Sequence, residues 1–126
     1  MKQRVADFIA DFLVANGIHD VFTVTGGGAM YLNDAFGHHT KLHCIYNHHE
    51  QASAIAAEAY ARYSGQLAAV CVTSGPGGTN AITGVLGGWL DSIPMFIVSG
   101  QVKYSTTVKS TNLNLRQLGD QEFNIV

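Results

Sequence analysis

Charged side chains are scarce in this chain of 126 residues, at 13% against 47% hydrophobic residues. The chain has seven lysines and arginines and nine aspartates and glutamates, which gives a net charge of -2. No cluster of basic residues occurs, so the sequence argues against nucleic acid as a partner. Because little charge is available to cover the surface of a domain of this size, we expect part of that surface to be covered by another protein surface.

Long hydrophobic runs and a signal peptide are also missing. No apolar run approaches the roughly 20 residues of a membrane-spanning helix, and residues 1–4 lead into an amphipathic helix. The chain has two cysteines, Cys44 and Cys71, which lie in apolar runs without metal-ligand spacing to any histidine. We therefore expect a cytoplasmic protein with reduced core thiols, no membrane contact and no metal ligands of its own.

What the chain does contain is a regular alternation of strand and helix patterns. Strands are predicted at residues 20–24, 42–46, 67–72 and 94–98, and helices at 2–16, 29–36, 48–64 and about 82–90. Residues 102–119 are polar and irregular, and residues 120–123 look like the start of another helix. The alternation is typical of a three-layer α/β fold, with a doubly wound, mostly parallel sheet and helices on both faces. Residues 1–126 are predicted to form one domain.

Two helices show a clear apolar face. In the first helix it comprises Val5, Phe8, Ile9, Phe12 and Leu13, and we expect this face to pack on the sheet. In the last predicted helix it comprises Ile82, Val85, Leu86, Trp89 and Leu90, while Gly84, Gly87 and Gly88 would let another element approach closely. The alanine-rich helix at 48–64 has a similarly smooth flank.

Three polar or glycine-rich segments follow predicted strands: residues 25–28, Glu50 and residues 73–80. In a parallel sheet these would open onto one edge, where α/β folds hold ligands. Glu50 has two interpretations. It either complements the dipole of the helix that it begins, or it is a buried acid aimed at this edge. His48 and His49, beside it, are expected to cap or pack and are left out of the catalytic set.

A nucleotide site at this edge is poorly supported. A dinucleotide fingerprint would need a third glycine at the place of Tyr31 and an acid at the end of the next strand. The second glycine-rich turn, residues 73–80, lacks the lysine of a phosphate-binding loop. Taken alone, that turn could also be no more than a tight connection between a strand and a helix.

Four motifs occur in a recognisable order along almost the whole chain: VFTVTGGGAM, HHEQASAIAAEAYAR, VTSGPGGTNAITGV and LDSIPMFIVSGQV. With them the chain resembles the N-terminal pyrimidine-binding domain of thiamine-diphosphate enzymes of the acetolactate synthase, pyruvate oxidase and benzoylformate decarboxylase superfamily. The similarity is greatest to acetolactate synthase. The resemblance implies an enzyme that acts on 2-oxo acids by decarboxylation or carboligation, as a transferase or lyase, with thiamine diphosphate as cofactor.

The resemblance also implies roles for individual residues. Glu50 would be catalytic, because in the family this acid hydrogen-bonds the N1′ nitrogen of the aminopyrimidine and so activates the cofactor. The residues implied to line the cofactor site are Gly26, Gly27, Thr73, Pro76 and Asn80, together with Glu50. Gln101 and Gln121 would lie on the substrate side.

A further implication concerns what lies outside this chain. In the family a GDG motif in a separate C-terminal domain holds the diphosphate through Mg²⁺, and no GDG motif occurs here. We therefore expect part of a longer multi-domain enzyme, or one subunit of a split enzyme, with no turnover by itself. The implied partners are the diphosphate-binding domain, a 2-oxo acid, and further copies in a homodimer or tetramer.

Two alternatives remain open. Asp120 stands where the synthases carry an aromatic residue, so a related carboligase or 2-oxo acid decarboxylase is as compatible with the sequence as acetolactate synthesis. A non-catalytic interaction or structural module with the same fold is a second class. The retained acid at position 50 argues for the enzyme.

Overall fold

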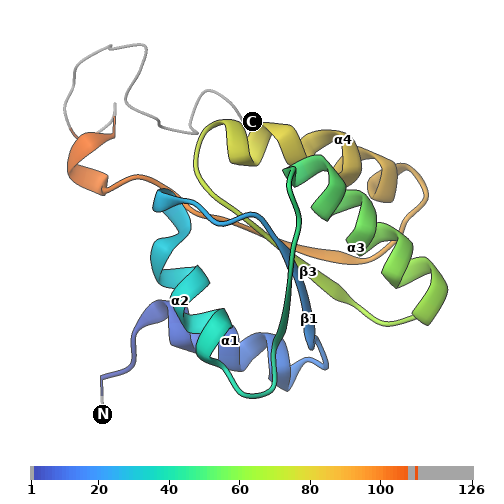
Figure 1. Cartoon of the computed structure of the whole chain (residues 1–126), viewed down its shortest axis with the longest axis horizontal. Coiled ribbons are helices and arrows are strands. Elements are labelled where there is room, and N and C mark those ends of the chain that lie inside the picture. Colours follow the sequence, from blue (N-terminus) through green and yellow to red (C-terminus); the bar gives the residue numbers. More distant parts are fainter. Residues whose placement is uncertain (1, 108–109, 111–126) are drawn as a thin grey trace.

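A single parallel sheet organises the chain. The computed structural model describes residues 2–107 and 110. Its four strands are β1 (Asp20–Thr23), β2 (His43–Tyr46), β3 (Ala68–Val72) and β4 (Met95–Ser99). They are arranged in the order β2-β1-β3-β4, and every neighbouring pair is parallel (Figure 1). In the central register, Val21 of β1 lies between Cys44 of β2 and Ala69 of β3.

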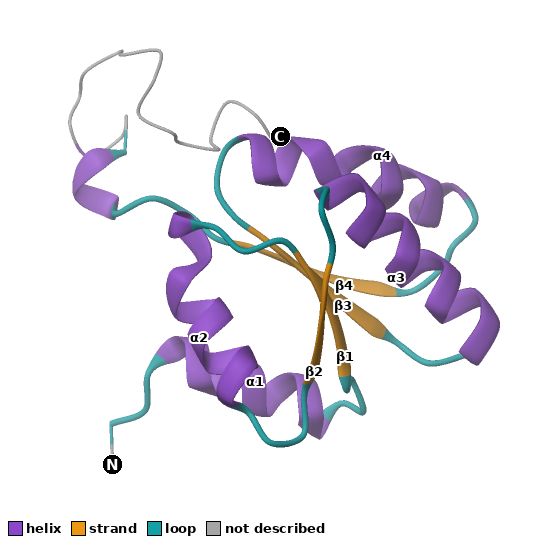
Figure 2. Ribbon diagram, viewed as in Figure 1, coloured by secondary structure: helices purple, strands orange, loops and turns teal. Residues whose placement is uncertain are grey.

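Helices cover both faces of the sheet, which confirms the three-layer, doubly wound α/β prediction. Helices α1 (Val5–Ala15) and α2 (Met30–His38) lie on one face, and α3 (Glu50–Ser64) and α4 (Pro76–Leu90) lie on the other (Figure 2). Two short 3-10 turns complete the described elements, η1 (Gly27–Ala29) and η2 (Tyr104–Thr106).

Alternate residues of the strands point into two separate hydrophobic cores, one on each face of the sheet. In β1, Val21 joins the core beneath α1 and α2, while Phe22 joins the core beneath α3 and α4. In β3, Cys71 points to the first core and its neighbours Val70 and Val72 to the second. All five residues of β3 are buried. This is the pattern of a central parallel strand covered on both sides.

The prediction for the buried face of the first helix was wrong in part. The residues of α1 that are buried are Ala6, Ala10 and Leu13, whereas Val5, Phe8 and Phe12 are 75%, 57% and 43% exposed. Phe12 still contacts the ring of Phe96 on β4, with centroids 6.0 Å apart. The small side chains face the sheet because they let the helix lie close to it.

Helix α4 has the same arrangement of small residues inside and large residues outside. Its buried positions are Gly77, Gly78, Ala81, Gly84 and Gly88. The large apolar residues Ile82, Leu86, Trp89 and Leu90 are 43%, 52%, 79% and 72% exposed. We call these four residues the outer face of α4. An exposed apolar face of this kind is what we expect of a surface that another protein surface covers.

Element ends differ from the predictions, most of all at α4, which begins at Pro76, so that residues 76–80 of the predicted glycine-rich turn belong to this helix. Helix α3 begins at Glu50 instead of residue 48, because His49 is extended and serves as its N-cap. Helix α1 starts at Val5 instead of residue 2, after an extended Arg4. The stretch predicted as irregular from residue 102 contains η2, and the predicted helix start at residues 120–123 lies outside the described residues. Within the described part of the chain, no helix is long and apolar enough to cross a membrane.

Candidate functional site

The carboxyl ends of the four parallel strands lie at one edge of the sheet, and the segments singled out in the sequence follow them. The loop at residues 24–26 and η1 follow β1, residues 47–49 lead from β2 into α3, and residues 73–75 lead from β3 into α4 (Figure 2). We call this edge the rim. The connections at the opposite edge, such as that from α4 to β4, carry none of the predicted site residues.

The two glycine-rich turns meet at the rim, as expected from the sequence. The backbone N–H of Gly28 donates a hydrogen bond to Oγ1 of Thr73 over 2.9 Å. A Cβ added to Gly26 would overlap the side chain of Thr73, and one added to Gly28 would lie 2.5 Å from Oγ of Ser74. Glycine is therefore needed at these positions because the second turn fills the space of a side chain.

The end of β4 joins the same contact. Gly100 is buried, and a Cβ there would lie 2.6 Å from the carbonyl carbon of Gly28 and 2.7 Å from Cα of Ala29. Its backbone N–H donates to the carbonyl of Val72 over 2.8 Å. The strand end at Gly100 is thus packed against the backbone of the first glycine turn, which in turn contacts the side chains of Thr73 and Ser74.

Glu50 is the first residue of α3 and lies half-buried at this rim. Its Oε2 atom accepts a hydrogen bond from Nδ2 of Asn80 on α4 over 2.9 Å. The turn before it is fixed by His49, whose Nδ1 accepts from the N–H of Gln51 over 3.1 Å. His49 is therefore a capping residue, as expected.

Gly77 connects the acid to the glycine turns. A Cβ on Gly77 would lie 2.7 Å from Cγ2 of Thr73 and 3.5 Å from Oε1 of Glu50. Sequence reasoning missed Gly77 as a site residue, although its place directly after Pro76 in the SGPGG segment was available as a signal. It also missed Gly28 and Gly100, because only the folded chain shows what lies against them.

A partly buried polar contact supports the turn that carries the acid. Nδ2 of Asn47 donates to Oγ of Ser53 over 3.1 Å, and the N–H of Asn47 donates to the carbonyl of Thr23 over 2.9 Å. Ser53 is fully buried. These bonds tie the start of α3 to the end of β1, so the orientation of Glu50 depends on the sheet as well as on its own helix.

Among the described residues, the remaining predicted site residues do not take part in the contacts around Glu50. Gly27 and Pro76 are exposed, and a Cβ on Gly27 would meet nothing within 4 Å. Gln101 is exposed just after β4, and its Oε1 accepts from the N–H of Val102 over 2.8 Å. Gln121 lies outside the described residues. The structure thus joins Gly26, Thr73, Glu50 and Asn80 and leaves Gly27, Pro76 and Gln101 at the periphery.

The cysteines are not part of this site. Both are free thiols, and burial raises the pKa of Cys71 to about 12 and that of Cys44 above its usual range. A thiol that keeps its proton is a poor nucleophile and a poor metal ligand. No group of three or more histidine, cysteine, aspartate or glutamate side chains among the described residues could hold a metal ion.

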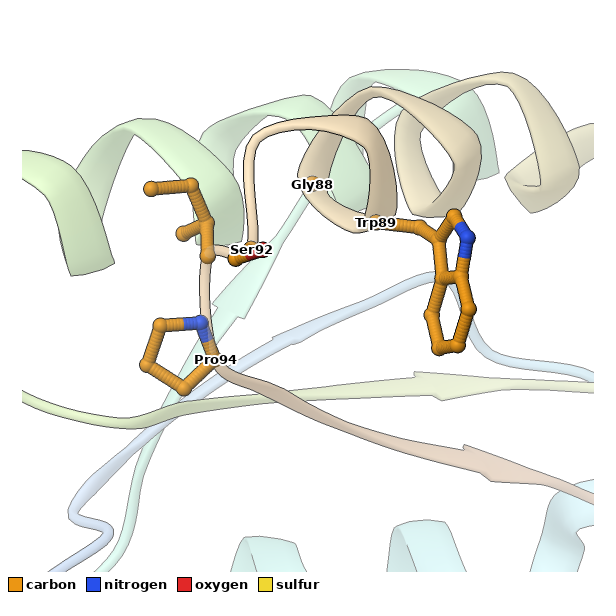
Figure 3. A pocket seen from close by; sticks show the side chains of 5 residues that line it. Gly88, Trp89, Ser92 and Pro94 are labelled. Carbon is orange, nitrogen blue, oxygen red and sulfur yellow. The ribbon is translucent and has the colours of Figure 1, made fainter.

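A hollow of about 460 Å³ lies elsewhere, at the turn from α4 to β4. It is lined by Gly88, Trp89, Ser92, Ile93 and Pro94 (Figure 3). This turn precedes β4, so it is at the edge of the sheet opposite the rim. None of its lining residues is an acid or a base, and we do not regard it as the functional site.

Comparison with known proteins identifies the family. The family model described as "Thiamine pyrophosphate enzyme, N-terminal TPP binding domain" matches residues 3–123. The chain belongs to this thiamine pyrophosphate enzyme family. Thiamine pyrophosphate is another name for thiamine diphosphate, so the resemblance and the cofactor class inferred from the sequence are confirmed.

Acetolactate synthases are among the relatives of this thiamine pyrophosphate enzyme domain. The large subunit from Haemophilus influenzae is 43% identical over 101 residues, which cover 80% of this chain and 18% of the relative. The large subunit from Buchnera aphidicola is 42% identical over 79% of this chain and 18% of the relative. Isozyme 3 from Escherichia coli is 39% identical over 79% and 17%. The chain spans less than a fifth of the length of these relatives.

Proposed function

We propose that this chain is the pyrimidine-binding half of a thiamine-diphosphate enzyme that acts on 2-oxo acids, as in acetolactate synthesis or a related decarboxylation. The observation that supports it best is the position of Glu50. Its carboxylate starts α3 at the rim, is held by Asn80, and lies beside the point where two glycine turns pack together.

The residues at the rim fit a flat nitrogen heterocycle. Oε1 of Glu50 lies on the side of Gly77, where no side chain separates it from the second glycine turn. No lysine, arginine or histidine forms an ion pair with Glu50 within residues 2–107. A carboxylate without a fixed cation can share a proton with a ring nitrogen, whereas a salt-bridged one is held as the anion.

In this proposal each rim residue has one task. Glu50 accepts or donates the proton at the pyrimidine nitrogen, and Gly26, Gly27, Thr73 and Pro76 form the wall beside the ring. When bound, thiamine diphosphate supplies the electron sink for cleavage next to the carbonyl of a 2-oxo acid. Gln101 and Gln121 are assigned to the substrate side. Orientation and exclusion of water are the contributions of the protein.

The half-buried state of Glu50 supports a second element of the proposal. A carboxylate that shares a proton needs a water-poor surrounding, and the chain by itself leaves Glu50 partly open to solvent. We assign the missing cover to a diphosphate-binding domain, which would also hold Mg²⁺. The outer face of α4 is assigned to contacts within a homodimer or tetramer. We also assign the protein to the cytoplasm, where its two free thiols would stay reduced.

The test is the replacement Glu50→Gln, which keeps the size of the side chain and removes its acid. It is made in the native protein that carries this chain, with thiamine diphosphate, Mg²⁺ and the diphosphate-binding domain present. Carbon dioxide release is measured with a panel of 2-oxo acids. We expect kcat to fall by about 10²-fold or more, the usual contribution of a general acid or base.

The matched control is Glu58→Gln on the same helix. Glu58 forms an ion pair with Arg62 at 2.6 Å and lies two turns from the rim. Its replacement should leave kcat within about twofold of the unmodified protein, because Glu58 bonds Arg62 and lies away from the rim residues. Unchanged activity in Glu50→Gln would remove the mechanism. An unmodified protein that releases carbon dioxide from none of the 2-oxo acids would favour a non-catalytic module with this fold.

A further inference from the structure

We propose that Asn80 is the positioning residue of Glu50. Its side-chain amide holds Oε2, so that Oε1 is the carboxylate oxygen presented to a ligand at the rim. The proposal rests on the function proposed above and gives Asn80 a task different from that of a wall residue. Asn80 then acts through Glu50.

The contact joins two helices at the ends that face the rim. Glu50 is the first residue of α3, and Asn80 is the fifth residue of α4. The distance from Nδ2 of Asn80 to Oε2 of Glu50 is 2.9 Å, that of a well-formed hydrogen bond to a carboxylate. Both side chains are half-buried. Neither helix could place the carboxylate by its own geometry alone, since a glutamate side chain has three rotatable bonds.

Gly77 leaves the space beside the second oxygen free of a side chain of its own. A methyl group at this position would lie 3.5 Å from Oε1, and it would also press on Cγ2 of Thr73 at 2.7 Å. A side chain there would therefore occupy the space beside Oε1. Asn80 and Gly77 act on different oxygens of one carboxylate, the first by bonding Oε2 and the second by leaving room next to Oε1.

The chemistry of the donor matters as much as its place. An amide is neutral, so it orients the carboxylate without fixing it as an anion to the degree that an arginine would. This suits a group whose task is to exchange a proton with a ring nitrogen. Orientation of a reacting group is worth a large part of a catalytic barrier, and displacement by about 1 Å can cost on the order of 10²-fold.

The first experiment measures the contact without cofactor, by a double-mutant cycle on thermal unfolding. The variants are Glu50→Ala, Asn80→Ala and the double variant, with Thr79→Val as the control. Thr79 is on the same turn and bonds the carbonyl of Pro76 instead of Glu50. We expect the fall in Tm of the double variant to be smaller than the sum of the falls in the two single variants. Thr79→Val, by contrast, should lower Tm by the same amount with or without Glu50→Ala. Full additivity for Asn80 would overturn the contact.

The second experiment uses the loaded protein and separates positioning from packing. Asn80→Asp keeps the shape of the side chain but turns the donor toward Glu50 into a second carboxylate. If Asn80 only packs, Asn80→Asp is milder than Asn80→Ala. If it positions Glu50, we expect kcat to fall about tenfold or more in Asn80→Ala and at least as far in Asn80→Asp, with KM for the 2-oxo acid within about twofold.

The two proposals fail in different ways. In a Glu50→Gln background, adding Asn80→Ala should lower kcat by less than about twofold, because residues that act as a unit are not additive. A further large loss would show that Asn80 acts on its own and would overturn the positioning role while leaving Glu50 essential. If Glu50→Gln itself keeps full activity, the proposed function fails first.

Discussion

Replacement of Gly84 by alanine tests how the two helices that carry Glu50 and Asn80 are spaced. A Cβ at position 84 would lie 2.5 Å from Cβ of Ala54, 2.9 Å from the backbone N of Ile55 and 3.0 Å from the carbonyl carbon of Ala54. Carbon atoms normally approach to about 3.5–4.0 Å. Because two of these contacts are backbone atoms, α3 as a whole has to move away from α4.

The magnitude follows from two opposing terms. Alanine is favoured over glycine in a helix interior by about 1 kcal/mol. Overpacking typically costs about 1–3 kcal/mol, and a contact with backbone belongs at the upper end. The expected net effect is a loss of about 2 kcal/mol in the free energy of unfolding, or a fall of about 8 °C in Tm for a domain of this size.

Two neighbouring glycines of α4 provide matched controls. A Cβ on Gly87 would meet Oε2 of Glu58 at 3.3 Å, the far end of a flexible side chain. Gly87→Ala should therefore raise the free energy of unfolding by about 0.5–1 kcal/mol through helix propensity. A Cβ on Gly88 would press on the terminal methyl of Met95, which can move, so Gly88→Ala should lie between the other two variants.

The assay is thermal and urea unfolding of the three variants beside the unmodified chain. The expected order of stability is Gly87→Ala, Gly88→Ala, Gly84→Ala, from highest to lowest. Adding Ala54→Gly to Gly84→Ala should recover part of the loss, because it removes one of the contacting atoms and leaves the backbone of Ile55 in place. A Gly84→Ala variant as stable as the unmodified chain would refute the reasoning.

Three further predictions concern other parts of the fold. Ser92 has φ 56° after α4, with its N–H bonded to Trp89 over 3.1 Å, and Ser92→Gly should gain about 0.5–1 kcal/mol in thermal unfolding. Gly100→Ala should cost about 3 kcal/mol or prevent folding, because its Cβ would meet the backbone of Gly28. Stability should fall as the pH rises from about 9, the ordinary pKa of a thiol, toward the raised pKa of about 12 of Cys71. In that window the unfolded thiol loses its proton and the folded one keeps it, at up to about 1.4 kcal/mol per pH unit.

Controls for these three are available in the chain. Gly27→Ala adds a methyl group that meets nothing within 4 Å, so it should leave stability nearly unchanged where Gly100→Ala does not. Cys71→Ala should flatten the alkaline loss of stability measured by urea unfolding at several pH values. If stability still falls steeply with rising pH in Cys71→Ala, the alkaline loss of stability comes from other groups. A Ser92→Gly variant less stable than the unmodified chain would contradict the strain at position 92.

The sequence allowed the element order, the parallel sheet and the meeting of an acid and two glycine-rich segments at one edge of that sheet to be predicted. Those features depend on local signals: the continuous apolar run of β3, the glycine-rich turns and the acid at the start of α3. The bond between Asn80 and Glu50 was beyond sequence reasoning, although both residues were singled out, since 30 positions separate them and only helix packing brings them together.

The choice of buried face was also decided by tertiary packing. Hydrophobic periodicity marked Phe8 and Phe12 of α1 as core residues, yet both are exposed while Ala6 and Ala10 are buried. Periodicity records which side of a helix is apolar, but it does not record how close the neighbouring layer lies. Where the layers approach closely, small side chains are the ones that fit inside.

Sequence alone determined that this is an α/β domain with an acid and two glycine turns at the carboxyl end of its strands, because strand patterns, turns and motifs are local. Tertiary structure decided which oxygen of Glu50 is bonded, which glycines have no room for a side chain, and which apolar residues remain outside. These depend on distances between elements remote in the chain. Such distances are set by the packing of both layers against one sheet.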